Sequence, residues 1–254
     1  MWDELFLLPF LTGLVLAVIL PVLGCYLRLR DEWLAALAYS HVAAAGALLA
    51  MVAGLPPAAG GMAAAGVAGV GKRAISRRLS GSAGHALLLL GGWSLAILLT
   101  ANQPMVERLG HALFDGQLYF AGITQFVGVA IGGGLALAIL RYLSPSLLLA
   151  HVYPDFFRLR GRRIWPMHSG FDLLAALVLA LATMNVGVMA AFALIFVPPW
   201  LAFRRGANWR RGLLLSIALG VLGYILAFAC ALMLDQPFGP VLAMALLLIG
   251  IFAA

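Results

Sequence analysis

The chain contains 254 residues, of which 64% are hydrophobic and only 10% are charged, and its formal net charge is +7. That composition excludes a water-soluble domain of this size, which needs a much larger charged surface, and it leaves no room for a soluble catalytic domain. The positive charge does not indicate nucleic-acid binding, because basic residues at helix ends beside lipid are ordinary in membrane proteins. We therefore predict an all-α, polytopic membrane protein embedded in the lipid bilayer.

Apolar stretches of about 17–25 residues recur along the chain, each long enough to cross a hydrocarbon core of roughly 30 Å as a helix. They predict a single transmembrane domain, residues 1–254, with nine spans, or eight if the seventh proves to be a broken helix. Pro198 and Pro199 remove backbone donors inside that seventh span, so we expect a bend or break there. The predicted spans are 5–27, 33–53, 57–72, 84–100, 119–142, 167–183, 186–203, 212–234 and 239–253.

Small residues gather in the second and third spans, at 43–46 and 60–71. In lipid, helices associate through close backbone approach along such small-residue faces. We therefore expect a compact bundle that pairs with a second copy of the chain.

Nearly all Lys and Arg residues fall into four clusters, at 28–30, 72–78, 141–163 and 204–211, and these clusters occupy alternate loops. Basic loops stay in the cytoplasm of membrane proteins. The pattern predicts an outer N-terminus, a cytoplasmic C-terminus and an outer loop at 101–118.

The segment from Gly66 to Arg73 comes close to the phosphate-binding P-loop, in which backbone amides and a Lys hold phosphates while a Ser or Thr holds Mg²⁺. Here Arg73 stands at the hydroxyl position, and the preceding residues belong to a small-residue membrane span. We expect no ATPase site on this chain, so that any ATP is hydrolysed elsewhere.

His41 follows Ser40 well inside the second span, and an ionisable side chain at membrane depth is a functional-site candidate because its burial is costly. A neutral imidazole can coordinate a transition metal; the alternative is a neutral histidine hydrogen-bonded between helices. Asn185, at an outer helix junction, either lines a pathway or caps a turn. For Asp172, near the cytoplasmic edge, we favour a helix-terminal or interfacial role over a proton or ion site. The remaining histidines, expected to be solvated, are His85, His111, His151 and His168.

The longest polar interruption of the hydrophobic pattern is the loop 149–163. Pro154 can start a short helix there, Asp155 is favourable in its first turn, and Gly161 can end it. The helix either lies on lipid headgroups or inserts into a groove on another protein. Its apolar face would contain Phe156, Phe157 and Leu159, and its basic face Arg158 and Arg160.

Four spaced motifs point to one family when they are taken together. They are Arg30 with Ser40-His41 and Gly46; Tyr153-Pro154-Asp155 with Gly161; Val186-Gly187 with Pro198; and Asp235-x-Pro237-x-Gly239-Pro240. In order and spacing they resemble the motifs of the membrane permeases of zinc- and manganese-type metal ABC transporters, the ABC-3 family. The similarity runs over nearly the whole chain.

This resemblance implies a bundle like that of type II ABC importer permeases in the bacterial cytoplasmic membrane. It also implies a homodimer, two cytoplasmic ATPase subunits that carry ATP and Mg, and an extracytoplasmic solute-binding protein. The polar loop becomes the ATPase-coupling helix, from Tyr153 to Gly161. His41 becomes a metal ligand in the substrate pathway, to which we also assign Ser40 and Asn185, and the chain is a transport subunit rather than an enzyme.

The sequence departs from the family pattern at three positions. The family's intramembrane Asp, four residues before the His, falls on Leu37, which removes the hard oxygen ligand of an Asp/His pair. A divalent metal ion remains the expected substrate, and zinc is favoured over manganese. A small residue of the family falls on Phe157, and a small or hydroxyl residue falls on Phe192.

Three alternatives stay open. The substrate of the importer can be a metal chelate or another small solute. The chain can instead be a proton-coupled secondary transporter in which Asp172 or His41 titrates. It can also be a membrane scaffold whose basic loops bind anionic lipid.

Overall fold

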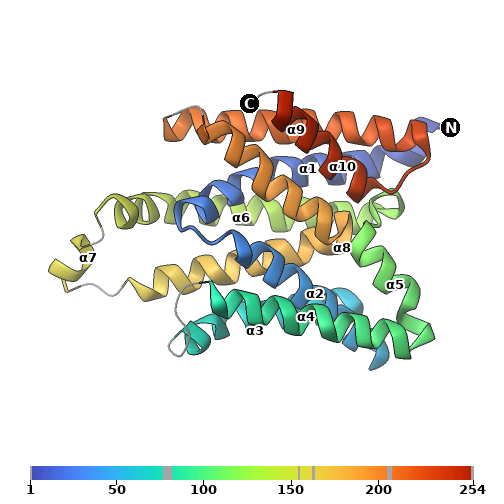
Figure 1. The fold of residues 1–254 in the computed structure, drawn as a ribbon, viewed down its shortest axis with the longest axis horizontal. Coiled ribbons are helices and arrows are strands. Elements are labelled where there is room, and N and C mark those ends of the chain that lie inside the picture. Colours follow the sequence, from blue (N-terminus) through green and yellow to red (C-terminus); the bar gives the residue numbers. More distant parts are fainter. Residues whose placement is uncertain (1, 77–81, 154, 162–163, 205–207, 253–254) are drawn as a thin grey trace.

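The computed structural model describes residues 2–76, 82–153, 155–161, 164–204 and 208–252. Every regular element in these ranges is a helix, so the all-α prediction is confirmed. The helices pack side by side into one bundle (Figure 1). They are α1 (Trp2–Leu29), α2 (Trp33–Val52), α3 (Pro57–Ser76), α4 (Ala83–Asn102), α5 (Pro104–Asp115), η1 (Leu118–Phe120), α6 (Ile123–Val152), α7 (Phe156–Leu159), α8 (Trp165–Arg204), α9 (Trp209–Leu234) and α10 (Phe238–Phe252).

Six of the described helices are long and apolar enough to cross a membrane: α1, α2, α4, α6, α8 and α9. The 40 residues of α8 would extend about 60 Å as a straight helix, but the helix is interrupted at the non-helical Gly187. Its two arms meet there and fold back (Figure 1), so α8 supplies both the sixth and the seventh predicted span. Together with α3 and the 15-residue α10, the described chain contains the nine predicted segments in order.

The expected loop at 101–118 is not irregular, because its centre forms the 12-residue helix α5. Pro104 lies in the first turn, where its missing N–H would have had no helical partner, and Glu107 complements the positive helix end. One face of α5 is apolar and the other polar. A helix of this kind contains no membrane-length apolar run, which is the signal that identifies a span.

The fifth predicted span is too short. α6 runs ten residues past the expected end at 142 and includes 149–152 of the expected coupling loop. The polar residues after Leu140 indicated a loop, but the Tyr26 hydroxyl donates a hydrogen bond to Ser144 Oγ (2.8 Å) and holds this part of α6 against α1. A tertiary contact therefore extends the helix through Pro145.

Of the bend or break expected at the proline pair, the break is not found. α8 continues through Pro198 and Pro199 to Arg204, and the helix is interrupted at Gly187 instead. Pro199 leaves the carbonyl of Ile195 without its helical donor, and Gly24 of α1 lies directly against that oxygen. Protein thus covers the freed group, and the absence of a side chain at Gly24 allows the approach.

The core lies around α2 and α8, whose membrane-length windows are each 72% buried, whereas those of α4 and α6 are 22% buried. The largest fully buried side chains include Tyr39, Phe171, Tyr224 and Phe238. α4, α6 and α9 instead expose many large apolar side chains, as helices that face lipid do. The central pair α2 and α8 therefore positions the functional residues.

The small residues of α2 and α3 meet as predicted. A Cβ atom on Gly60 would lie 2.5 Å from the carbonyl oxygen of Gly46, so only glycines allow this approach. The P-loop-like segment from Gly66 to Lys72 is helical throughout. It therefore has no phosphate-cradling loop, as the sequence indicated.

The bundle has two distinct ends (Figure 1). The α7 end carries α7, and the α5 end carries α5 and the Gly187 turn of α8. Basic residues from separate predicted clusters gather at the α7 end, where Arg30 and Lys72 share a partner and Arg28 stacks on Phe203 at 4.7 Å. These contacts bring the first two predicted clusters together at one end, and the charge pattern predicts that this end is cytoplasmic.

Candidate functional site

His41 lies near the middle of α2 and is buried. Its Nδ1 atom is 2.8 Å from the carbonyl oxygen of Leu37, one turn earlier. Because a carbonyl only accepts hydrogen bonds, Nδ1 carries the proton, and in a neutral ring Nε2 keeps its lone pair. A backbone carbonyl that fixes the tautomer in this way is the usual support of a metal-binding imidazole.

Two aromatic side chains flank the imidazole. The ring of His41 is 6.0 Å from Trp93 of α4 and 5.8 Å from Phe114 of α5, measured between centroids. Gly92 brings α4 this close, because a Cβ at that position would lie 2.8 Å from the backbone carbon of His41. The aromatic neighbours are thus placed by backbone contact between α4 and α2.

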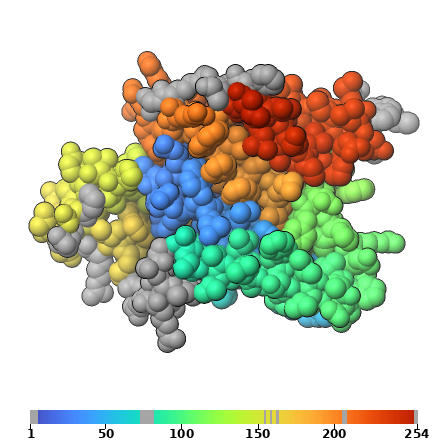
Figure 2. Space-filling model, viewed as in Figure 1, coloured from blue at the N-terminus to red at the C-terminus, as the bar shows by residue number. Residues whose placement is uncertain are grey.

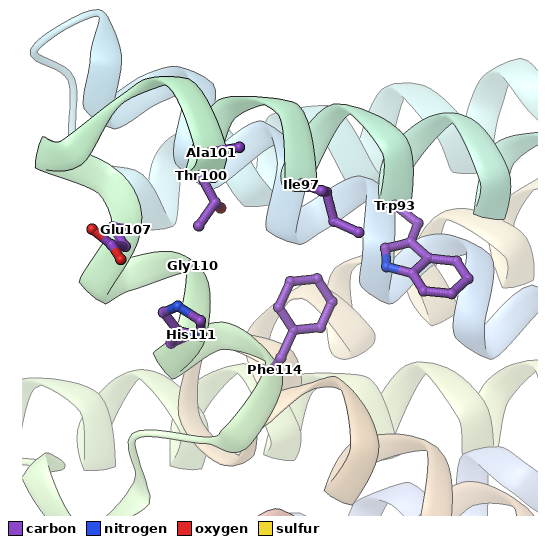
Figure 3. A pocket seen from close by; sticks show the side chains of 8 residues that line it. All are labelled: Trp93, Ile97, Thr100, Ala101, Glu107, Gly110, His111 and Phe114. Atoms are coloured by element: carbon purple, nitrogen blue, oxygen red, sulfur yellow. The ribbon is translucent and has the colours of Figure 1, made fainter.

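A cavity of about 450 Å³ opens between α4 and α5 at the α5 end (Figure 3). Trp93 and Phe114 form part of its wall, and both also contact His41. Glu107 and His111 lie one turn apart on α5 and supply its ionisable groups. The lining residues are Trp93, Ile97, Thr100, Ala101, Glu107, Gly110, His111 and Phe114.

The turn of α8 holds the end of α5. Gly116 (φ 96°) and Gly187 (φ 85°) face each other, and a Cβ on Gly187 would lie 2.7 Å from the nitrogen of Gly116 and 2.9 Å from the carbonyl oxygen of Phe114. The carbonyl of Asn185 accepts a hydrogen bond from the Gln117 amide at 3.2 Å. Movement of the α8 turn would therefore be passed to Phe114.

The three predicted pathway residues are buried, and the hydrogen bonds of His41 and Asn185 stay within their own helices. The Asn185 side chain donates to the carbonyl of Leu181 (2.8 Å), which is a contact within its own helix. The Ser40 hydroxyl is buried without a hydrogen-bond partner among the described residues. In the same part of the chain, no three His, Cys, Asp or Glu side chains are grouped to hold a metal ion. A metal at His41 would therefore need ligands from outside the groups seen here.

Four charged side chains form an ionic cluster at the α7 end. Asp172 Oδ1 lies 3.0 Å from Arg30 Nη1 and 3.0 Å from Lys72 Nζ. Glu32 lies 3.1 Å from Arg30 and 2.8 Å from Lys72. The cluster is neutral overall and joins the loop after α1 to α3 and α8. Asp172, near the start of α8, thus has a structural role at the interface between helices, through its ion pairs with Arg30 and Lys72.

Near the α7 end, Glu32 is half-buried and His85 is buried. Burial alone would raise the pKa of Glu32, but Arg30 and Lys72 outweigh that effect and hold its pKa below the ordinary value. The expectation that His85 is solvated is wrong, because α4 packs on α2 and places His85 against Tyr39, with 6.0 Å between ring centroids. His168 is half-buried, whereas His111 and His151 are exposed.

The polar loop contains the short helix that the sequence predicted. α7 spans Phe156–Leu159, and Gly161 (φ 63°) adopts the left-handed conformation that ends it. Leu159 is 82% exposed, and Arg160 stacks over Phe156 at 4.5 Å. α7 projects beyond the other helices (Figures 1 and 2). Pro154 and the side chain of Arg158 lie outside the described part of the chain.

The pair Glu107 and His111 was not among the predicted site residues. Their spacing of four residues, continued by Asp115, was the available signal, because such residues share one face of a helix. That signal has meaning only if the segment is helical. An expected loop at 101–118 therefore hid it.

The sequence model of the ABC 3 transport family matches residues 3–254. A Haemophilus influenzae protein named as a probable iron transport system membrane protein is 26% identical over 242 residues, which cover 90% of this chain and 89% of that protein. The manganese transport system membrane protein MntB of Synechocystis sp. is 26% identical over 219 residues, 84% of this chain and 69% of that protein. In the structure of PsaBC from Streptococcus pneumoniae in complex with Fab, one chain matches with a TM-score of 0.84 at 18% identity, covering 98% of this chain and 90% of that one. This likeness confirms the fold.

Proposed function

Since the chain belongs to the ABC 3 transport family, we propose that it is the permease through which an ATP-binding-cassette importer moves a divalent transition metal ion into the cytoplasm. It is a multi-pass protein of the cytoplasmic membrane. Two relatives named for iron and manganese transport support a metal as the cargo. ATP and Mg²⁺ act on separate subunits, and this chain provides the passage and the coupling.

The observation that carries the proposal is the state of His41. A buried imidazole whose Nδ1 proton is donated to Leu37 offers Nε2 to a metal ion. One imidazole is too few ligands for a stable site. The remaining ligands would come from elsewhere, and we propose a homodimer as the functional unit.

Zinc is the ion that we propose, on ligand chemistry. Manganese prefers oxygen ligands, whereas imidazole suits zinc as well as iron. Position 37 carries a leucine, so the residue one turn before His41 brings no carboxylate. Parallel uptake measurements with zinc, iron and manganese test this preference, and faster uptake of manganese would contradict it.

The two ends of the bundle suggest the two kinds of partner. α7 projects at the α7 end with Leu159 exposed, which suits a helix that docks in a groove of an ATPase subunit. The opposite end carries the cavity between α4 and α5. We propose that a solute-binding protein delivers the substrate there.

The other candidate functions have less support. A proton-coupled transporter that uses Asp172 would need that carboxylate free, but Arg30 and Lys72 already contact it. A metal chelate remains the alternative cargo. It would depend less on the free Nε2 of His41, so the same histidine variant separates it from a free ion.

Replacing His41 by alanine is expected to reduce metal uptake on the order of 100-fold, because the lost nitrogen binds the ion directly. Uptake is measured in proteoliposomes that contain the permease and its ATPase. Val42→Ala is the matched control, since Val42 is the next residue of α2 and only half-buried. Folded His41→Ala protein with normal uptake would contradict the proposed role.

Leu159→Glu is expected to weaken retention of the ATPase subunit by about tenfold or more, because a charge replaces an apolar anchor at the docking helix. Met233→Glu is the control, since Met233 is 85% exposed and is the last residue but one of α9. Co-purification and metal-stimulated ATP hydrolysis are measured for both. Equal retention by the two variants would show that α7 does not dock the ATPase.

A further inference from the structure

The cavity between α4 and α5 has a polar side and an aromatic side (Figure 3). Glu107 and His111 lie on α5, and the aromatic side is formed by Trp93 of α4, which is 47% exposed, and by the half-buried Phe114 near the end of α5. Both residues of the polar pair are exposed at the surface of the described chain. Neither residue belongs to the ionic cluster or to α7.

A carboxylate and an imidazole four residues apart on a helix lie on one face and can bind the same ion. Asp115 lies one turn further along that face of α5 and adds a second negative charge. Two protein ligands completed by water bind a divalent cation weakly. Weak, water-exposed ligation suits a site that must pass its ion on.

Trp93 and Phe114 line the cavity and also contact His41, whereas His41 itself does not line it. The two rings therefore lie between the cavity and the imidazole. Apolar side chains at such a position exclude a hydrated ion until they move apart. The backbone of Phe114 rests on Gly187, so the turn of α8 is placed to move one of the two rings.

We propose that this cavity is the outer receiving site for the divalent cation. Glu107 and His111 are its first protein ligands, and Trp93 with Phe114 forms an aromatic gate to His41. The inference rests on the proposed function, because it takes the cargo to be a metal ion. It adds an entry site that is separate from His41 and a barrier between the two.

Binding is tested with the permease–ATPase complex in lipid nanodiscs, using Co²⁺ as the probe because its absorption reports ligation by imidazole. In a His41→Ala background the Co²⁺ signal of the outer site is expected to persist. Adding Glu107→Gln and His111→Ala is expected to weaken that binding by about tenfold or more. Arg108→Gln, on the same helix but outside the cavity, is the control. Unchanged Co²⁺ binding after the double replacement would overturn the receiving site.

Uptake separates this inference from the proposed function. The Glu107→Gln, His111→Ala variant is expected to need about tenfold more metal for half-maximal uptake while its rate at saturating metal stays near that of the wild type. His41→Ala is expected to lose the saturated rate. Normal concentration dependence in the double variant, with an inactive His41 variant, overturns the receiving site alone. Normal transport by His41→Ala overturns the proposed function.

The gate is tested with a cysteine at position 41. In a background with Cys25 and Cys230 replaced by alanine, His41→Cys is expected to react slowly with a thiol reagent added from the α5 side. Trp93→Ala should accelerate that reaction by about tenfold. The matched control is Trp165→Ala, at the first residue of α8 and outside the cavity lining. An unchanged rate with Trp93→Ala would show that the ring is not a barrier.

Discussion

Replacing Asp172 by asparagine is expected to lower the free energy of unfolding by about 3 kcal/mol. Asp172 contacts Arg30 and Lys72 at 3.0 Å each, and all three side chains are at least 88% buried. Asparagine keeps the shape but leaves two cations with Glu32 as their remaining carboxylate in the cluster. Thermal unfolding of the purified protein in detergent measures the loss.

Charge balance, rather than the loss of one hydrogen bond, explains this effect. Lys72→Gln added to Asp172→Asn restores neutrality and should recover part of the stability, because the Arg30–Glu32 pair then stands alone. Asp31→Asn is the matched control: Asp31 is exposed, and its φ of 55° is one that asparagine adopts readily. A double variant less stable than Asp172→Asn would contradict the charge argument.

Gly187→Ala is expected to destabilise the protein by at least about 2 kcal/mol and to abolish uptake. The backbone at Gly187 has φ 85° and ψ 166°, which is a region open essentially to glycine alone. A methyl group would also meet the backbone of Gly116 and Phe114 within 3 Å. Because the turn of α8 holds the end of α5, its distortion would displace Phe114 from His41.

Gly134→Ala is the matched control for this replacement. Gly134 lies in α6, and no atom outside its own helix neighbourhood lies within 4 Å of the position of the added Cβ. Alanine there should leave uptake unchanged and raise stability by up to about 1 kcal/mol. If Gly187→Ala unfolded at the temperature of Gly134→Ala, the close contact between α8 and α5 would be wrong.

Part of the candidate site was visible in the sequence. His41 stands out because a histidine within an apolar span needs a reason to be there. The carbonyl of Leu37 that fixes its tautomer, and the rings of Trp93 and Phe114 beside it, depend on where α4 and α5 pass α2. Glu107 and His111 were hidden because their spacing is informative only on a helix.

The amino-acid sequence by itself determined the membrane class, the nine helical segments, the alternation of basic loops and the short helix before Gly161. These features follow from hydropathy, charge and turn chemistry within one stretch of chain, which are local properties. Only the tertiary structure decided that α8 is interrupted at Gly187 and continues as a helix through Pro198, because Gly24 and the end of α5 supply the deciding contacts. It also decided that Asp172 pairs with Lys72, 100 residues away. Helix packing likewise forms the cavity whose lining residues Trp93 and Phe114 contact His41. Contacts between distant segments depend on how the helices pack, and no single stretch of sequence contains that information.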